Sequence, residues 1–377
     1  MKKKVILGLS GGVDSAVSLI RLIEEGYDVE ACFMRNWDSA LNNDVLGNPN
    51  DINDICPQEK DYMDALDVAN KLGVKIHRID FVKEYWDYVF QYFLDEYKKG
   101  RTPNPDIMCN KEIKFKAFLD YANNLGCDYI AMGHYARVIH TENEAYLLRG
   151  IDENKDQTYF LCQLNQNQLK KALFPIGDMI KPDVRKKALD CGLSVAKKKD
   201  STGICFIGER NFSKFLSNYL PSKKGKMVML DGTIIGEHDG LMYYTIGQRK
   251  GLKIGGLDGY DKDAWFVLGK DLEKNELIVG QGFSNPYLYS NKCTLENVNW
   301  IPLKKFEGIK KCSAKFRYRS KDEIVYLEWI GENEMVVTYD NVRAVTPGQS
   351  CVFYDGEYCL GGGIINKVYM NDDLRKY

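Results

Sequence analysis

The sequence predicts a doubly wound α/β domain followed by two β-rich domains. In the first half of the chain, buried strand-like segments alternate with helix-like segments that end at glycine, an order typical of βαβ units and a parallel sheet covered by helices. Beyond about residue 210 the helical periodicity fades and short alternating segments take over, which indicates a small central β-rich domain and a C-terminal β-barrel. We therefore expect domains over residues 1–210, 211–283 and 284–377.

The elements of the α/β domain follow from apolar runs and from glycine stops. The expected strands are Lys4–Leu9, Val29–Met34, Val74–Ile79 and Tyr129–Met132, and the expected helices are Asp14–Glu25, Lys60–Leu72 and Phe115–Leu125. In such sheets ligands bind beyond the carboxyl ends of the strands. Gly8–Ser15, Met34 and Gly133–His134 fall at such ends, so a binding site is expected there.

Composition and cysteine usage narrow the class of protein. The chain has 377 residues and a net charge of −1, which excludes a uniformly basic coat for nucleic acid but allows a local basic surface. No apolar run approaches the roughly 20 residues of a membrane span, and the amino terminus does not have the pattern of a signal peptide. The eleven cysteines include no CxxC pair, so we expect no zinc site, a reducing environment and a cytoplasmic location.

The loop after the first strand, Ser10-Gly11-Gly12-Val13-Asp14-Ser15, has the composition of a phosphate-binding turn. Its glycines allow a close approach of the backbone to an anion, and the helix that follows offers unpaired N–H groups. It is neither a Walker A loop nor a GxGxxG dinucleotide loop. The alternative is an ordinary glycine-rich turn, and the position of the full string on the first strand of an α/β domain favours nucleotide binding.

Two cysteines stand in unusual surroundings. Cys109 follows the proline- and asparagine-rich segment Thr102–Met108, which we interpret as a loop, and precedes a helical run expected to begin near Lys111. Cys205 is flanked by glycines and preceded by three consecutive lysines. Positive charge and a helix N-terminus lower the pKa of a thiol, so both cysteines are candidates for reactivity, against the alternative that they are buried structural residues.

The quoted motifs carry a resemblance to a known family. The string SGGVDS resembles the PP-loop of ATP pyrophosphatases. Together with TPNPDIMCNKEIKF, DQTYFL, STGICFIGER, GEHDGLMYYTIGQRKGL and RAVTPGQ, in order along nearly the whole chain, it is similar to the tRNA-specific 2-thiouridylases. The resemblance implies an enzyme that adenylates the C2 oxygen of the wobble uridine of tRNA with ATP, accompanied by Mg²⁺, and replaces that oxygen with sulfur.

The resemblance also assigns residues. It implies that ATP is bound by Gly8, Leu9, Ser10, Gly11, Gly12, Val13, Asp14, Ser15, Met34 and Gly133. It implies that Cys205 carries a persulfide, that Cys109 completes the transfer at the persulfide or at the base, and that a transient Cys109–Cys205 disulfide results. Asn104, Pro105 and Asp106 would contact the target base, with Asp106 a candidate proton donor or acceptor.

Contacts with tRNA are implied for His134, Lys155, Asp156, Gln157, Arg317, Tyr318 and Gln349. The implied partners are tRNA, through its anticodon arm, and a persulfide sulfur-donor protein, either a cysteine desulfurase or a sulfur relay protein. For His134 taken alone, a hydrogen-bonded histidine at a strand end is the simpler interpretation.

The segment Lys311–Lys321 points to RNA contact independently of any family. Read as one strand, it places Lys315, Arg317 and Arg319 on one face and turns Phe316 and Tyr318 inward. Such a face is either simply solvated or follows a phosphate backbone. The Asn/Asp-rich segment Asn42–Asp54 is expected to be a polar loop.

Two other functions are compatible with part of this pattern. A PP-loop amide or amidine synthetase acting on a small molecule would keep SGGVDS but would need neither a second reactive cysteine nor a basic β domain. A non-catalytic tRNA-binding protein would keep the fold but would not depend on Cys205 or Asp14 for its role in cells.

Overall fold

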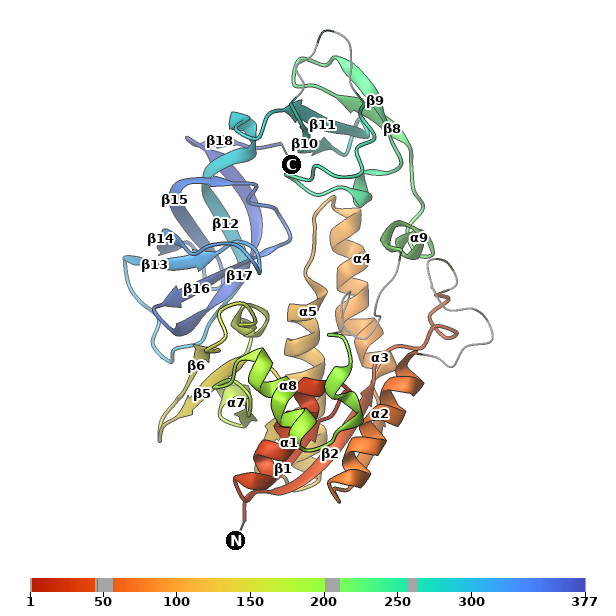
Figure 1. Ribbon diagram of the computed structural model, residues 1–377. Coiled ribbons are helices and arrows are strands. Elements are labelled where there is room, and N and C mark those ends of the chain that lie inside the picture. Colours follow the sequence, from red (N-terminus) through yellow and green to blue (C-terminus); the bar gives the residue numbers. More distant parts are fainter. Residues whose placement is uncertain are drawn as a thin grey trace.

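The computed structural model describes residues 2–44, 46, 57–200, 211–255, 259 and 263–376. Three sheets organise this part of the chain. Figure 1 shows the α/β domain around the amino terminus, the C-terminal barrel beside it, and the central β sheet at the far end of the molecule. Cys205 and part of the Asn42–Asp54 loop lie outside the described residues, whereas Asn42 and Asp44 are buried.

The first sheet is parallel and has the strand order β3-β2-β1-β4-β7. Its strands are β1 (Lys4–Gly8), β2 (Asp28–Arg35), β3 (Ile76–Asp80), β4 (Tyr129–Ala131) and β7 (Ala172–Leu173). The chain winds outward from β1 to β3 and then returns to the other side of β1. The switch point of this doubly wound sheet therefore lies between β1 and β4, where such folds bind their ligands.

Helices cover both faces of this sheet, as the sequence pattern predicts. The α-helices of the described residues, on the sheet and beyond it, are α1 (Val13–Glu24), α2 (Pro57–Lys71), α3 (Val82–Tyr85), α4 (Gln91–Lys98), α5 (Pro105–Met108), α6 (Phe118–Asn124), α7 (Gln166–Leu169), α8 (Lys181–Asp190) and α9 (Phe212–Ser217). Two π-helical segments, η1 (Trp86–Phe90) and η2 (Cys109–Ala117), continue α3 and α5. Short 3₁₀ turns are η3 (Thr158–Leu161), η4 (Ser194–Lys197), η5 (Leu241–Tyr243) and η6 (Pro286–Leu288).

The expected helix Phe115–Leu125 is the end of a longer helical run. Helical backbone continues from Pro105 through η2 and α6 to Asn124. The predicted start is wrong because the helix begins at Pro105, and proline at the first position of a helix costs no hydrogen bond. Asn104 is the N-cap, and its Oδ1 accepts a hydrogen bond from the backbone N–H of Asp106 (3.2 Å).

The central sheet has the order β10-β11-β8-β9. Its strands are β8 (Gly225–Val228), β9 (Ile234–His238), β10 (Trp265–Asp271) and β11 (Glu276–Gln281). β11 and β8 run parallel, and the other neighbours are antiparallel. Alternate apolar side chains of these strands, such as Met227, Leu277 and Val279, bury a small separate core.

The C-terminal strands form a closed barrel, as predicted. They are β12 (Tyr289–Trp300), β13 (Ile309–Lys315), β14 (Glu323–Trp329), β15 (Met335–Arg343), β16 (Ser350–Asp355) and β17 (Tyr358–Met370), with β18 (Asp373–Leu374) paired to β17. β12 pairs with both β15 and β17, which closes a ring of six strands. The sequence reasoning missed the hairpin β5 (Ala136–His140) and β6 (Ala145–Arg149), which joins the α/β domain to β17.

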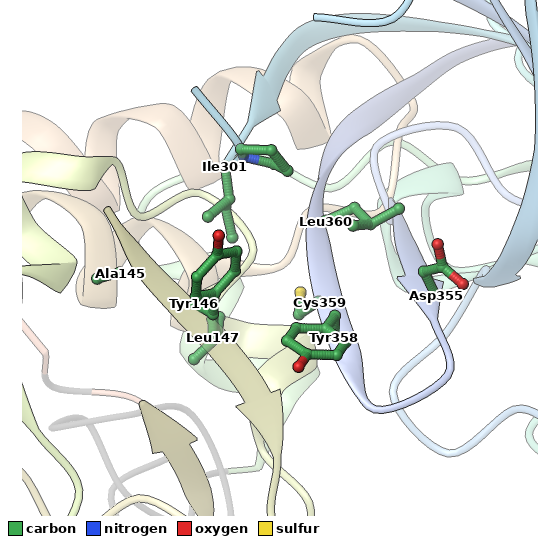
Figure 2. Close-up of a pocket in the computed structure, with 9 residues that line it drawn as sticks. Ala145, Tyr146, Leu147, Ile301, Asp355, Tyr358, Cys359 and Leu360 are labelled. Atoms are coloured by element: carbon green, nitrogen blue, oxygen red, sulfur yellow. The ribbon is translucent and has the colours of Figure 1, made fainter. Parts of the chain in front are cut away.

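A pocket of about 210 Å³ lies at this junction between the hairpin and the barrel. Figure 2 shows its largely apolar lining, in which the rings of Tyr146 and Tyr358 meet edge to face at 5.8 Å. None of the residues that line it belongs to the site expected from the sequence.

Candidate active site

The glycine loop joins β1 to α1 at the switch point of the sheet. The N-cap of α1 is Gly12, which has no side chain. The cap residue therefore gives the N–H groups of the first turn no side-chain hydrogen-bond partner. Ser15 Oγ accepts a hydrogen bond from the Ser10 backbone N–H (3.2 Å) and donates one to the Gly12 carbonyl (3.0 Å). The loop is thereby curled over a helix terminus that can receive an anion.

Small residues surround this terminus because the backbones approach closely. A Cβ added to Gly11, whose φ is +74°, would lie 2.2 Å from the Asp61 carbonyl oxygen. A Cβ added to Gly133 would lie 2.9 Å from the Ser15 nitrogen, and one added to Gly8 would lie 3.0 Å from Met34 Cε. The positions expected to bind ATP at the ends of β1, β2 and β4 are therefore neighbours, and they form a glycine-lined cradle at the N-terminus of α1.

A cluster of charged residues holds Asp14 at the start of α1. Lys181 Nζ donates to both carboxylate oxygens of Asp14 (2.8 Å each), and the Tyr135 hydroxyl donates to Oδ1 (2.8 Å). The same Lys181 Nζ lies 2.8 Å from Asp200 Oδ1. Burial first, and then the Asp14 carboxylate, raise the pKa of Tyr135, which keeps its hydroxyl protonated as the donor.

Asp200 is the far member of this cluster. It accepts hydrogen bonds from Lys155 (2.7 Å) and Arg185 (2.8 Å) in addition to its contact with Lys181. Partial burial works to raise its pKa, but the hydrogen bonds from Lys155 and Lys181 outweigh burial and lower the pKa to about 2. The sequence reasoning missed Tyr135, Lys181, Arg185 and Asp200. The spacing of Lys181 and Arg185, four residues apart, was the available signal.

A second lysine ties α2 to the loop. Lys198 Nζ donates to the Gly11 carbonyl (3.0 Å), to Asp61 (2.7 Å) and to Asp64 (2.6 Å). Two residues near the end of the described segment 57–200, Lys198 and Asp200, are therefore both anchored beside the glycine loop.

The described residues contain no cluster of three His, Cys, Asp or Glu side chains that could hold a metal ion by themselves. The carboxylates nearest the loop, Asp14, Asp61 and Asp200, are each paired with lysine. Mg²⁺ bound with a nucleotide takes its ligands mainly from phosphate oxygens and water, with one or two carboxylates. Both oxygens of Asp14 already accept from Lys181, so the residues present fit the mode in which phosphate oxygens and water supply the ligands.

Cys109 does not have the surroundings predicted for it. It lies four residues after Pro105, inside the continuous helix rather than at its N-terminus, and its side chain is fully buried in a core that includes Ile107, Ile113 and Phe115. The prediction that Cys109 follows a loop and precedes a helix beginning near Lys111 is wrong, and its burial agrees with the alternative of a buried cysteine. Cys205 lies outside the described residues, so the expected pairing of the two thiols stays a prediction.

The other described cysteines match the structural interpretation. All except Cys191, which is half-buried, are buried, and none of them is in a disulfide. Burial raises the pKa of Cys32, Cys312 and Cys359 to about 12, which leaves these thiols protonated and unreactive.

His134 lies in the core at the end of β4, between the rings of Phe115 and Phe174 (centroids 6.0 Å in each case). Burial, and then the charge of Lys114, lower the pKa of His134 well below its ordinary value, so the ring is neutral. Within the part of the chain that the structure describes, His134 Nδ1 has no hydrogen-bond partner. The simpler interpretation of a hydrogen-bonded histidine is therefore wrong for this atom.

Residues 155–157 are connected to the glycine loop. Besides Lys155 on Asp200, the side chain of Gln157 accepts a hydrogen bond from the Tyr135 backbone N–H (3.0 Å). Asp156 is buried and accepts from the Thr158 hydroxyl (2.9 Å). The segment therefore supports Tyr135, and through it Asp14.

The basic strand predicted over Lys311–Lys321 is shorter in the structure. β13 ends at Lys315, and the Ser320 backbone N–H donates to the Arg317 carbonyl (3.0 Å) in a turn. The alternation is confirmed as far as Phe316, which is buried. Beyond Phe316 the predicted continuation as a strand is wrong, because the chain leaves the sheet to turn into β14, but the direction predicted for Tyr318 is confirmed. Tyr318 does face inward, with its ring 4.3 Å from that of Phe160.

The remaining expected tRNA contacts, Arg317 and Gln349, lie at the junction of the domains. Arg317 Nη2 is within 2.8–2.9 Å of the carbonyls of Ile246 and Ala344 and of the Thr346 hydroxyl. Gln349 Nε2 donates to the Thr102 carbonyl (2.8 Å). Both side chains therefore make contacts within the protein that the sequence did not predict.

Comparison with known proteins covers the whole chain. Residues 3–209 match a family described as a tRNA methyl transferase HUP domain, residues 213–281 a tRNA methyl transferase PRC-barrel domain, and residues 290–365 an aminomethyltransferase β-barrel domain. Among solved structures, a 4-thiouridine synthetase in complex with RNA and ATP is 15% identical, covers 58% of this chain and 46% of its own, and has a TM-score of 0.35, too low to support an inference. Within the described residues no helix is long and apolar enough to cross a membrane.

Full-length relatives are much closer. The tRNA-specific 2-thiouridylase MnmA of Acholeplasma laidlawii is 58% identical over 100% of both chains. The proteins of the same name from Mesoplasma florum and Lactiplantibacillus plantarum are 57% and 55% identical, over 98% and 99% of this chain and 100% and 98% of theirs. With this identity along its whole length, the chain belongs to the family of tRNA-specific 2-thiouridylases.

Proposed function

We propose that this chain uses ATP to replace the C2 oxygen of the wobble uridine of tRNA with sulfur. The observation that carries the proposal is the glycine cradle at the N-terminus of α1, found in a chain 58% identical over its full length to a tRNA-specific 2-thiouridylase. A carbonyl oxygen is a poor leaving group, so the reaction needs an activated oxygen and a sulfur nucleophile.

The glycine loop would supply the activation. The N–H groups at the start of α1 and the hydroxyls of Ser10 and Ser15 would hold the pyrophosphate part of ATP, and Met34 and Gly133 would adjoin the adenosine part. Mg²⁺ would offset the charge of the phosphates, with phosphate oxygens and water as its main ligands. Attack of the C2 oxygen on the α-phosphate would release pyrophosphate and leave an adenylated base.

Sulfur transfer would use two thiols. We propose that the terminal sulfur of a Cys205 persulfide reaches C2, where the C–O bond breaks and AMP leaves. Cys109 would attack Cys205 Sγ, either before or after the sulfur bonds to C2, so that the sulfur–sulfur bond of the persulfide breaks. The products would be 2-thiouridine and a Cys109–Cys205 disulfide, which an external thiol must reduce. Asp106 would donate or accept the proton at the base.

The buried state of Cys109 sets a condition on this scheme. Its thiol has to become accessible when the substrate is bound, and the helix around it has an irregular backbone that supports such a change. η2 is a nine-residue π-helical segment, and π-helical hydrogen bonding is rare and often found at functional sites. The half-buried residues Asn104–Asp106, at the start of the same helix, would face the uridine.

The RNA partner and the sulfur donor belong to the same proposal. His134, Lys155, Asp156, Gln157 and Tyr318 are the proposed tRNA contacts, carried over from the family motifs. The motifs also assign Arg317 and Gln349 to tRNA, but the polar groups of these two side chains are bonded within the protein. A splayed anticodon base suits recognition by stacking and by polar atoms such as Nδ1 of the neutral His134, which has no hydrogen-bond partner among the described residues. The persulfide would come from a cysteine desulfurase or a sulfur relay protein.

We also propose the domain division at residues 210/211 and 283/284. Its support is that the parallel sheet, the central sheet and the six-stranded barrel fall within the three ranges, while the hairpin β5–β6 bridges from the first range to the barrel.

Labelled-sulfur transfer to unmodified tRNA tests the function. Purified protein with ATP, Mg²⁺ and a persulfide donor should form 2-thiouridine and release AMP only when tRNA is present. Cys205→Ser should abolish 2-thiouridine, measured by nucleoside mass spectrometry, and should leave tRNA binding intact. AMP release that ignores tRNA and proceeds with a small amine would support the rival synthetase. Unchanged 2-thiouridine in cells that carry Cys205→Ser or Asp14→Ala would support the non-catalytic protein.

A further inference from the structure

Residues 100–103, directly before Asn104, are held from outside the α/β domain. The Lys270 side chain of β10 donates to the Gly100 carbonyl (2.8 Å), and the hydroxyls of Thr102 and Thr245 lie 3.1 Å apart. The central domain therefore contacts this short segment at Gly100 and at Thr102, and the segment leads into the helix of Asp106 and Cys109.

The C-terminal barrel contacts the same segment. The Thr102 backbone N–H donates to the Pro347 carbonyl (3.0 Å). The amide group of Gln349 donates to the Thr102 carbonyl at 2.8 Å and lies 3.5 Å from the Pro103 carbonyl. Both backbone groups of Thr102 are therefore bonded to the loop 347–349.

Arg101 adds an ionic contact between the α/β domain and the barrel. Its guanidinium donates to Glu296 Oε1 (2.5 Å) and to Asn366 Oδ1 (2.6 Å), on β12 and β17, and it also lies near Glu96 of α4. Burial of the guanidinium works to lower the pKa of Arg101, but its two glutamate partners outweigh burial and raise it. The charge at this contact is therefore permanent.

The close contact between residues 101–102 and the barrel loop 347–349 requires glycine at position 348. Gly348 has φ of +89°, and a Cβ there would lie 2.9 Å from both Arg101 Cβ and the Thr102 nitrogen. The two backbones are therefore in direct contact, and a displacement of the loop 347–349 moves residues 101 and 102 with it.

Arg317 stabilises the loop 347–349 through hydrogen bonds to the residues that precede it. Its Nη2 bridges the carbonyl of Ile246, next to Thr245, and the carbonyl of Ala344 and the hydroxyl of Thr346, which precede Pro347. The Arg317 side chain thus connects the segment around Thr245 with the loop 347–349, and both of these contact Thr102.

We propose that Gln349 is a positioning residue. Through the carbonyls of Thr102 and Pro103, it fixes the position of Asn104, Asp106 and the helix that follows. Arg317 supports Gln349 by holding the loop 347–349. The inference rests on the proposed function for its chemical consequence. It differs from the role that the family resemblance gives these two residues, which is direct contact with tRNA. A small shift of groups that must meet a reacting base lowers the rate far more than the affinity.

The test compares Gln349→Ala with Asn291→Ala. Asn291 is a matched control, because its amide also makes a side-chain hydrogen bond on the barrel, to Asn371 (2.9 Å), without touching residues 100–103. For Gln349→Ala we expect single-turnover 2-thiouridine formation at saturating tRNA and ATP to slow about tenfold, the value of roughly one hydrogen bond. We expect the Kd for tRNA to change less than twofold, and Asn291→Ala to match the wild type.

Amide hydrogen exchange provides a readout that needs no activity. Exchange at residues 104–110 of the free protein should be faster in Gln349→Ala than in the wild type and in Asn291→Ala. A weakened Kd for tRNA with an unchanged rate at saturation, or unchanged exchange at residues 104–110, would overturn the positioning role. Absence of 2-thiouridine with the wild type would instead refute the proposed function and leave the exchange result to decide the inference.

Discussion

Lys181→Met should weaken ATP binding strongly without unfolding the protein. The ammonium group of Lys181 is the shared partner of Asp14 and Asp200, and its side chain is only 10% exposed. Methionine keeps the length and packing of the stem but removes the charge. Asp14, at the start of α1, then carries an uncompensated negative charge beside the site proposed for the phosphates.

The size of the effect follows from charge and distance. Two unit charges about 6 Å apart interact by about 3 kcal/mol at an effective dielectric constant of about 20. Solvent reaches Asp14, whose side chain is 31% exposed, so we take about half of that energy for each phosphate interaction. Since about 1.4 kcal/mol corresponds to a factor of ten, the Kd for ATP should rise between tenfold and a hundredfold.

Isothermal titration of the wild type and the variant with a non-hydrolysable ATP analogue measures the change. Lys186→Met is the matched control, since Lys186 lies on the same helix α8, is 74% exposed and pairs only with Asp190 among the described residues. The control should bind like the wild type. An unchanged Kd in folded Lys181→Met, or an equal loss in Lys186→Met, would contradict the electrostatic reasoning.

Three further predictions concern packing and pH. Gly133→Ala should abolish ATP binding in the same titration, because its Cβ would meet the Ser15 nitrogen at 2.9 Å, and retained binding would show that α1 can shift. Burial lowers the pKa of Lys270 to about 7, so the unfolded chain binds more protons between pH 7 and 10, and the free energy of unfolding should rise with pH there. In urea titrations Lys270→Met should make that slope shallower by up to about 1.4 kcal/mol per pH unit, and identical slopes would rule this out. The pKa of Asp200, lowered to about 2, contributes stability that is present above pH 4 and lost as the pH falls toward 2, so acid unfolding of Asp200→Asn should show a weaker dependence on pH in that window.

Local patterns in the sequence were sufficient for the architecture. Apolar runs and glycine stops identified four of the five strands of the parallel sheet and the helices α1 and α2 to within a few residues, because burial on both faces and helical periodicity are written into neighbouring residues. The change of pattern near residue 210 indicated the β-rich remainder. The position of the glycine loop at the end of β1 also followed from sequence, since strand, loop and helix are consecutive.

The partners of the site residues were decided by the tertiary structure. Lys181 is 167 positions from Asp14, and Gln349 is 247 from Thr102, so no local pattern could pair them. The burial of Cys109 depends on which side of a helix meets the core, and the start of that helix was obscured by Pro105. The sequence by itself determined which segments form elements, because short-range sterics and hydrophobic alternation act within a few residues. Only the folded chain decided which charges, carbonyls and thiols face one another, because those contacts depend on the packing of three separate sheets.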